Sequence, residues 1–409
     1  MSIPVRRALA AALVSATTLA VLTVGSSPAS ADEAFYTPPS PLPAGRDGDV
    51  IKSQPSNVNN AKATRIMYLT RDAKNQPIPV TGTVLVPTKP WTGPGPQPIV
   101  AYAPFTAGMG DQCAVSKTLA GSGSPDLASG FQSGFINPLL EKGIAVAQTD
   151  YQGLGTPGEH TYVVRAAEAH AVLDVVRAAQ RLPGSGLPAN GPVGITGYSE
   201  GGGASASAVE LAPEYAPELD VKGAYAGAAP ADKAVLAKSL DGGYAVGFLG
   251  YALIGINAAY PETKILDLAN EQGRQLFEEA RKTCTMDAVF KYAFKQSSTL
   301  TKDGRPVSAY LNEPPFRAVV EDMKVGNRKP AAPVLVEHAP NDDIVPAPQG
   351  RQLAKDWCGK GANVQFKDIP SVIPVGSHVL GMMGAGGNSA NWLADRFAGK
   401  PASGNCGQF

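Results

Sequence analysis

The chain carries few charged residues, and their charges cancel. Charged residues make up 17% of the 409 positions, and the formal net charge at neutral pH is zero. No run of basic residues follows Arg6 and Arg7 at the extreme N-terminus. A protein that binds nucleic acid needs a concentrated positive surface, so this composition argues against a nucleic acid as partner. The 45 glycines and 36 prolines indicate a loop-rich globular protein instead.

Cysteine is also scarce, and its spacing excludes the common metal motifs. The cysteines are Cys113, Cys284, Cys358 and Cys406, and no two of them form a Cys-x-x-Cys pair. We therefore expect no metal site, and we expect disulfides if the chain is exported. Three pairings are open. The favoured one joins Cys358 to Cys406, which ties down the C-terminal tail, and leaves Cys113 to pair with Cys284.

Only one apolar stretch approaches the length of a membrane span, and it lies near the N-terminus. Residues 8–24 are apolar, follow the two arginines, and precede Ala29-Ser30-Ala31, which has the form of a cleavage site. This pattern predicts a secretory signal peptide over residues 1–31. The alternative is a membrane anchor, but the stretch is short and contains Ser and Thr. We expect a secreted, extracellular chain that begins near Asp32 and has no stable membrane span.

The most informative motif is Gly197-Tyr198-Ser199-Glu200-Gly201. The apolar run 192–196 before it predicts a strand, and the small residues 202–211 after it predict a helix. A serine on such a turn holds its hydroxyl clear of the sheet, and the flanking glycines avoid Cβ clashes there. This is the nucleophile elbow of the α/β-hydrolase fold. The alternative is a glycine-rich turn with an incidental serine.

Strands and helices alternate between residues 98 and 226. This alternation predicts a mostly parallel sheet flanked by helices, and together with the elbow motif it predicts an α/β-hydrolase fold. An antiparallel hairpin is expected before it, and residues 32–60 are expected to form an extended N-terminal arm because they are rich in Pro, Gly and Asn. The expected elements are the hairpin strands 63–70 and 78–86, the strands 98–102, 143–149, 192–196 and 221–226, and the helix 161–181.

Residues 233–324 interrupt the alternation. They contain several helix-like segments and no clear strand, and the α/β pattern resumes at 333–337. We expect an α/β-hydrolase core over 61–232 and 325–409, with a helical cap or lid inserted at 233–324. The alternative is an ordinary second domain with no gating role. The apolar stretch 244–260 would supply either an acyl channel or the packed core of the cap itself.

The order of residues along the chain restricts the choice of catalytic base. In this fold the acid and then the histidine follow the serine. His160 and His170 precede Ser199, so we expect them on a helix surface or in packing. His338 ends the next strand and comes too early to follow the acid. His378, in an expected loop near the C-terminus, is therefore the candidate base.

The acid is expected in the loop after strand 333–337, where Asp342 and Asp343 compete. Many hydrolases of this fold carry an Asp four residues before the Pro of Val-Pro, so we favour Asp342. Asp343 is then expected to face solvent or to cap a helix. The acid would orient the imidazole and stabilise the imidazolium without taking up its proton.

Two backbone N–H groups should form the oxyanion hole. One belongs to Glu200, which directly follows the nucleophile. The other should come from the loop 103–110, where Thr106 is the preferred donor and a plain glycine turn is the alternative.

Several of these segments together resemble the secretory lipases of the yeast lipase A type, which have relatives in actinomycetes. They are Gly197 to Gly202, Asp342 to Pro346, Cys358 to Val364 followed by His378, and Leu211 to Leu219. The resemblance runs from about residue 35 to the C-terminus. It implies a helical lid, a triad of Ser199, Asp342 and His378, and two disulfides, consistent with Cys113–Cys284 and Cys358–Cys406. It also implies hydrolysis of carboxylic esters, including triacylglycerols.

The chain departs from this family at two places. Bacterial relatives commonly carry His-Gly-Thr in the oxyanion loop, where this chain has Pro104-Phe105-Thr106. The stretch 370–377 before His378 is also longer than in the yeast type, which bears on acyl-chain preference.

The sequence thus predicts a secreted serine esterase or lipase that needs no cofactor. Its partner would be a lipid or ester substrate, and an insoluble substrate would be bound at an oil–water interface. The chain is expected to be a monomer. A short-chain carboxylesterase, a polyesterase or an acyltransferase would use the same residues. A serine peptidase would need an acidic amine-binding site, and no distinctive Glu pair indicates one. A non-catalytic exported binding protein would be expected to lack a triad member, and all three are present.

Overall fold

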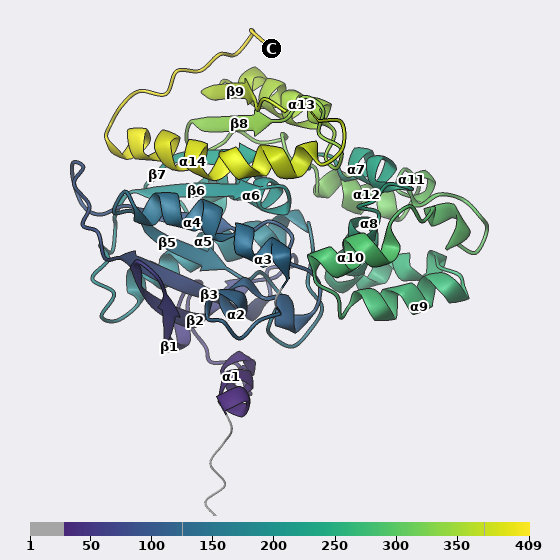
Figure 1. Ribbon diagram of the computed structural model, residues 1–409, viewed down its shortest axis with the longest axis horizontal. Coiled ribbons are helices and arrows are strands. Elements are labelled where there is room, and N and C mark those ends of the chain that lie inside the picture. The colour runs from purple at the N-terminus through teal and green to yellow at the C-terminus, as the bar shows by residue number, and fades with distance from the viewer. Residues whose placement is uncertain (1–27, 125, 372) are drawn as a thin grey trace, which may run out of the picture. The chain divides into compact units, whose positions relative to one another are not determined.

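A mixed sheet of nine strands runs through the part of the chain described by the computed structural model (Figure 1). The model describes residues 28–124, 126–371 and 373–409, so most of the expected signal peptide lies outside the described residues. Residues 36–409 form one compact unit, and the described residues before it, 28–35, belong to a separate unit and form most of α1 (Pro28–Tyr36). Among the described residues, no helix has the length and apolar character needed to cross a membrane.

The strand order is β1-β2-β3-β5-β4-β6-β7-β8-β9. The first three strands and the β3–β5 pair are antiparallel, and the strands from β5 to β9 pair in parallel. The expected mostly parallel sheet and the hairpin are therefore confirmed. The strands are β1 (Val50–Val58), β2 (Ala61–Arg71), β3 (Pro77–Pro87), β4 (Ile99–Ala103), β5 (Ala145–Thr149), β6 (Val193–Tyr198), β7 (Val221–Gly227), β8 (Val334–His338) and β9 (Val364–Asp368).

Helices cover both faces of the parallel strands, so these strands are apolar at nearly every position. On β4, Ile99 and Ala101 pack into a core with α5 (Arg165–Arg181) and α6 (Glu200–Tyr215). Val100 and Tyr102, on the opposite face, pack into a core with α4 and α14, which cross the near face of the sheet in Figure 1. The remaining helices of the core unit are α2 (Val115–Leu119), α3 (Leu127–Phe131), α4 (Ser133–Leu140), α13 (Ala347–Gly359) and α14 (Ser377–Phe397).

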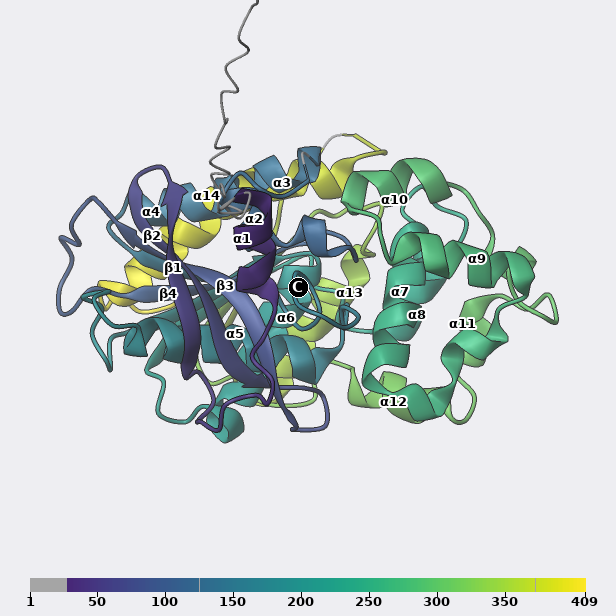
Figure 2. The same ribbon diagram turned by 90° about the horizontal axis from the view of Figure 1, so that it is seen from below.

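Between β7 and β8 the chain builds a block of helices without a strand. Figure 2 shows this block on one side of the sheet. It has its own apolar core, to which Leu249, Tyr251 and Ile254 of α8 contribute. Its helices are α7 (Lys233–Leu240), α8 (Gly247–Ala259), α9 (Glu271–Ala280), α10 (Thr285–Tyr292), α11 (Val307–Tyr310) and α12 (Phe316–Asp322).

Two expectations about local structure are wrong. Part of the expected extended arm is β1, which pairs with β2 along its length despite Pro55, because an edge strand tolerates a missing N–H. The expected loop around His378 is the start of the 21-residue helix α14. Its glycines suit close contact: a Cβ at Gly381 would lie 2.6 Å from the Tyr198 hydroxyl, and one at Gly386 would clash with the Gly134 carbonyl.

Candidate active site

Ser199 lies on the sharp turn between β6 and α6. Its φ of 59° and ψ of −122° place it in a strained conformation that few non-glycine residues adopt. The two flanking glycines make this turn possible. A Cβ on Gly197 would clash with the Gly201 carbonyl, and one on Gly201 would clash with the Ala103 carbonyl. The serine hydroxyl is thereby held at the carboxyl end of the sheet.

The structure brings Ser199, His378 and Asp342 into one hydrogen-bonded chain. His378 Nε2 lies 2.9 Å from Ser199 Oγ, and His378 Nδ1 lies 2.7 Å from Asp342 Oδ2. The histidine is the second residue of α14, and only 5% of it is exposed. This geometry lets the imidazole remove the serine proton while the carboxylate stabilises the positive charge.

The side chain of Asp342 is fully buried and held from several sides. Its Oδ1 accepts the backbone N–H groups of Ile344 at 3.0 Å and of Val345 at 2.8 Å. Burial alone would raise the pKa of Asp342, but the charge on His378, the hydrogen bonds from His338 and His378, and the charge on His338 hold this pKa well below its usual range. The carboxylate therefore stays ionised over the working pH range.

Asp343 does not point freely into solvent. Its carboxylate accepts the backbone N–H of Gly376 at 2.5 Å and of His378 at 3.0 Å, the hydroxyl of Ser377 at 3.1 Å, and the hydroxyl of Tyr244 at 3.0 Å. Of the two expected alternatives, this is the helix-capping one, because the bonds hold the N-terminus of α14. Asp343, the other candidate for the acid, thus fixes the backbone at His378.

His338 contacts the candidate acid, which the sequence analysis did not anticipate. It is fully buried, and its Nε2 lies 2.8 Å from the Val345 carbonyl and 3.4 Å from Asp342 Oδ2. Because two oxygens face Nε2, that nitrogen carries the proton. The signal in the sequence is a histidine that ends a strand four positions before the acid.

Thr106 is buried in the loop after β4, near the start of α6. Its carbonyl accepts the Thr285 hydroxyl at 2.5 Å, and its own Oγ1 lies 2.8 Å from the Tyr162 hydroxyl. Thr285 belongs to α10, so the helical block holds the loop after β4 directly. Gly108, at φ 137°, forms an isolated bridge with Cys284, and a Cβ there would lie 2.6 Å from the Cys284 Cα.

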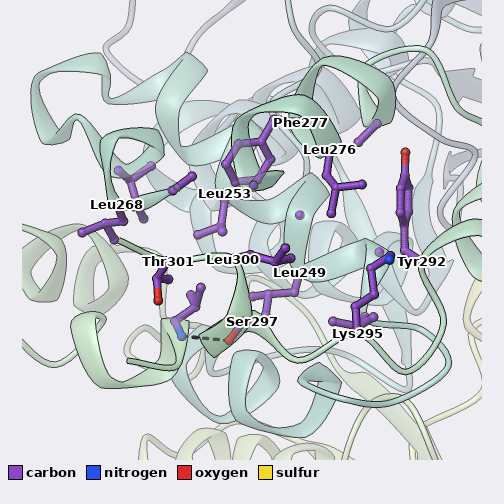
Figure 3. A pocket seen from close by; sticks show the side chains of 18 residues that line it. Leu249, Leu253, Leu268, Leu276, Phe277, Tyr292, Lys295, Ser297, Leu300 and Thr301 are labelled. Carbon is purple, nitrogen blue, oxygen red and sulfur yellow. Dashed lines mark hydrogen bonds between the residues drawn. The ribbon is translucent and has the colours of Figure 1, made fainter. Parts of the chain in front are cut away.

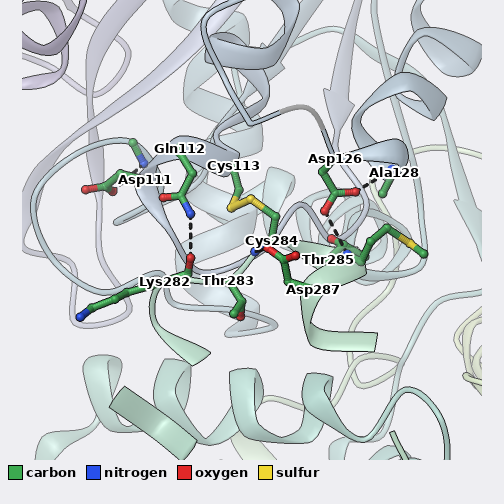
Figure 4. The surroundings of a disulfide bond; sticks show 12 residues. Asp111, Gln112, Cys113, Asp126, Ala128, Lys282, Thr283, Cys284, Thr285 and Asp287 are labelled. Atoms are coloured by element: carbon green, nitrogen blue, oxygen red, sulfur yellow. Dashed lines mark hydrogen bonds between the residues drawn. A yellow bond between two sulfur atoms is a disulfide. The ribbon is translucent and has the colours of Figure 1, made fainter. Parts of the chain in front are cut away.

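Two disulfides join the expected cysteines. Figure 4 shows Cys113 bonded to Cys284, with Gln112 Nε2 donating to the Lys282 carbonyl at 2.7 Å and Asp126 accepting from the backbone N–H of Met286 at 2.9 Å. This cluster connects the loop after β4 to α10. The second bond, Cys358–Cys406, joins the end of α13 to the C-terminal tail.

The two early histidines have other contacts. The His170 ring stacks on Tyr215 with ring centroids 4.0 Å apart. His160 lies before α5, is buried, and faces the Glu200 carboxyl through Nε2 at 3.0 Å. In the described part of the chain, no group of three or more His, Cys, Asp or Glu side chains is placed to hold a metal ion.

An apolar cavity of about 80 Å³ lies within the helical block (Figure 3). Residues from α8, α9 and the segment that follows α10 line it, and the labelled side chains converge on it. Its apolar lining includes Leu249, Leu253, Leu276, Phe277 and Leu300. Such a lining suits a hydrocarbon chain.

Comparison with known proteins gives consistent results. The family described as "Secretory lipase" matches residues 123–405. The chain is 31% identical over 387 residues to a "Probable inactive lipase MT1628" of Mycobacterium tuberculosis, covering 90% of this chain and 83% of that protein. It is 26% identical to the "Secreted triacylglycerol lipase LIP2" of Malassezia globosa, covering 96% and 87%. The structure of Candida antarctica lipase A in its closed state superposes with a TM-score of 0.79, at 26% identity over 91% of this chain and 87% of that one.

Proposed function

The chain belongs to the secretory lipase family, as an α/β-hydrolase and carboxylic ester hydrolase, and we propose that it is a secreted triacylglycerol lipase with a Ser199–His378–Asp342 triad. The observation that carries this proposal is the continuous hydrogen-bonded chain from Ser199 Oγ through both nitrogens of His378 to Asp342. The names of the secreted relatives and the signal-peptide pattern of residues 1–31 support an extracellular location.

The proposed reaction follows from this geometry. Ser199 Oγ attacks the ester carbonyl while His378 Nε2 takes its proton, and Asp342 stabilises the imidazolium. The backbone N–H groups of Glu200 and Thr106 bind the negative oxygen that develops. His378 then protonates the departing alcohol, and a water molecule repeats the sequence on the acyl-enzyme.

We propose that the helical block 233–324 is a cap that holds the acyl chain. One face of α8 lines the apolar cavity, and Tyr251 of the same helix packs edge-on against Tyr162 with ring centroids 5.7 Å apart. Tyr162 contacts Thr106. A single helix therefore extends from the cavity to the neighbourhood of the oxyanion loop.

The surface beside the proposed base supports an insoluble substrate. Val379, Leu380 and Met383 follow His378 on α14 and are 40%, 39% and 67% exposed. Exposed apolar side chains grouped next to a site favour contact with a lipid phase.

Initial rates on esters of graded acyl length, as emulsified triacylglycerols and as soluble esters, test the proposal, with Ser199→Ala as the control. We expect turnover of long-chain triacylglycerols by the native chain and its loss in the variant. Activity confined to short soluble esters would support a carboxylesterase or polyesterase instead. Because one relative is named an inactive lipase, the absence of any Ser199-dependent turnover would favour a non-catalytic binding protein.

A further inference from the structure

A buried cluster of ionisable groups lies directly behind the nucleophile. Glu200 begins α6, and its side chain is directed into the protein, where 2% of the residue is exposed. One oxygen of its carboxyl group lies 3.0 Å from Nε2 of His160, and the carboxyl group of Glu168 is a further hydrogen-bonding neighbour. The reaction proposed above uses only the backbone N–H of Glu200, so its carboxyl group has no assigned role.

The contacts of His160 determine the protonation of Glu200. Nδ1 of His160 lies 3.0 Å from the Gln152 carbonyl, which can only accept, so Nδ1 carries a hydrogen. Burial lowers the pKa of His160, which makes the ring neutral and leaves a lone pair on Nε2. The Glu200 oxygen that faces this lone pair must therefore supply the hydrogen. Burial raises the pKa of Glu200 to about 8, in agreement with a neutral acid.

Glu168, on α5, needs a proton for the same reason. Two carboxyl groups share a hydrogen bond only when at least one of them is protonated. The proton of Glu200 points to His160, so the proton between the two acids comes from Glu168. The other contact of Glu168 is the backbone N–H of Val163, at 2.7 Å. Burial raises the pKa of Glu168 well above its usual range.

The Glu200 side chain also connects to the oxyanion loop through His160. The ring of His160 packs edge-on against Tyr162 with ring centroids 5.9 Å apart, and the Tyr162 hydroxyl lies 2.8 Å from Thr106 Oγ1. The two residues whose backbone N–H groups would form the oxyanion hole are therefore linked through side chains. We propose that Glu200 and Glu168, both as neutral acids, are positioning residues that hold the Glu200 and Thr106 N–H groups at the spacing the oxyanion requires. The catalytic part of this inference rests on the proposed ester hydrolysis.

Other ionisable groups face this cluster from the neighbouring elements. Lys233 of α7 faces Glu168, donates to the Pro230 carbonyl at 2.6 Å, and has its pKa lowered to about 8 by burial. Asp150 faces His160 from the end of β5, and the Tyr151 ring stacks on His160 at 5.8 Å. Burial raises the pKa of Tyr151 and of Tyr162 well above the usual value, so both phenols remain neutral.

A rise in pH from 7 to 9 should therefore remove the protons of Glu200 and Lys233. An ionised Glu200 would no longer donate to His160 and would place a negative charge against the lone pair of that ring. That contact would be repulsive, and the Thr106 loop would move away from the elbow. Hydrolysis should consequently fall on the alkaline side because of the oxyanion hole, with the triad still intact.

Replacing an acid by its amide keeps the hydrogen bonds of the side chain and removes its ability to ionise, so the two effects can be measured separately. Glu200→Gln keeps one donor and one acceptor, as the neutral acid does, but cannot ionise. We expect kcat/KM on a soluble ester to fall about tenfold from pH 7 to pH 9 in the native chain and to stay level in Glu200→Gln. Glu200→Leu should lower kcat at pH 7 on the order of 100-fold with little change in KM, because it loses the link to Thr106.

Two variants serve as controls. Lys233→Met should retain the alkaline fall, and a level profile in it would assign the fall to the lysine and overturn the inference. Glu337→Gln changes another buried acid of raised pKa, one bound by Tyr225 and Asn388 within the sheet, and should keep the native profile. An unchanged alkaline fall in Glu200→Gln would also overturn the inference.

The backbone amide signals of Thr106 and Glu200, followed by NMR through the same pH range, provide a readout that does not need hydrolysis. Both should move with a common midpoint near pH 8 in the native chain, and the Thr106 signal should stay constant in Glu200→Gln. If the signals move together while no ester is cleaved, the proposed function fails and the positioning link stands. If esters are cleaved while the Thr106 signal does not respond, the positioning link fails.

Discussion

Asp343 accepts a hydrogen bond from the backbone N–H of His378 at 3.0 Å. Its neighbour Asp342 accepts one from the ring of the same histidine at 2.7 Å. Two consecutive carboxylates therefore hold different parts of the same histidine, one its backbone and the other its ring. Asp343 holds the first turn of α14, and in the proposed triad Asp342 would select the tautomer of the ring and stabilise its positive charge.

This division predicts different losses for the two acids. Asp342→Asn should lower kcat on a soluble ester on the order of 10⁴-fold, because an amide neither stabilises the imidazolium nor enforces the required tautomer. Asp343→Asn should lower kcat by roughly tenfold or less and should reduce the melting temperature, because it weakens the cap of α14. Equal losses of kcat in the two variants, each shown to be folded by circular dichroism, would contradict the assignment.

The buried acid behind the nucleophile predicts how stability changes with pH. Burial raises the pKa of Glu200 from 4.5 to about 8. Between those values the folded chain keeps a proton that the unfolded chain has released, so a rise in pH favours unfolding. The stabilisation is complete below the unfolded pKa and is lost as the pH passes through 8.

Urea unfolding between pH 5 and 8 measures this effect. The free energy of unfolding of the native chain should fall by a few kcal/mol more than that of Glu200→Gln over this range. Asp342 has the opposite effect, because its pKa is lowered in the folded chain. The stability that the ionised Asp342 contributes is lost as the pH falls below about 4, and Asp342→Asn should not show this loss. Parallel curves for the native chain and Glu200→Gln would show that Glu200 is already ionised at pH 5.

The two disulfides should have different effects on catalysis. Cys113–Cys284 spans 171 residues and ties the loop after β4 to α10, next to the carbonyl contact between Thr106 and Thr285. The double variant Cys113→Ser/Cys284→Ser should lose about 2–5 kcal/mol of stability and also lose kcat, because the oxyanion loop is no longer fixed. The matched control is Cys358→Ser/Cys406→Ser, which frees only the tail and should lower the melting temperature at nearly constant kcat. A constant kcat in the first variant at a temperature where it remains folded would count against the role of this link.

Much of the site could be predicted because of the topology of parallel sheets. Ser199 follows β6 and Asp342 follows β8, and the carboxyl ends of parallel strands meet at one edge of the sheet. Chain order then left His378 as the one suitable histidine. The apolar strands and the hairpin also follow from local pattern, because strands covered on both faces have apolar residues at every position.

Other features depend on contacts that the sequence does not display. The helix α14 was missed because four of its residues are glycines, which weaken isolated helices. At least Gly381 and Gly386 are there for close packing against β6 and α4. Glu168 and Glu200 lie 32 positions apart and meet only because α5 packs beside α6, so no sequence pattern links them. Likewise, the position of His338 at the end of a strand, four residues before Asp342, does not by itself show that its ring faces that carboxylate.

The cavity in the helical block leads to a prediction about acyl length. Gly250 of α8 lines the cavity, and a Cβ at this position meets no atom of the described residues within 4 Å. A larger side chain therefore enters empty space without displacing the backbone, and a helix favours Leu over Gly. If the cavity holds the acyl chain, Gly250→Leu removes the volume that the distal part of a long chain needs.

We expect the ratio of kcat/KM for an oleoyl ester to that for a butyryl ester to fall about tenfold or more in Gly250→Leu. Gly359→Leu is the matched control. It adds the same side chain at an exposed helical position of α13 where a Cβ also meets no neighbour in the described chain, and the native ratio should persist. If the ratio is unchanged in Gly250→Leu while a structure of the variant shows the leucine within the cavity, the cavity belongs to the packing of the cap and the acyl chain lies elsewhere.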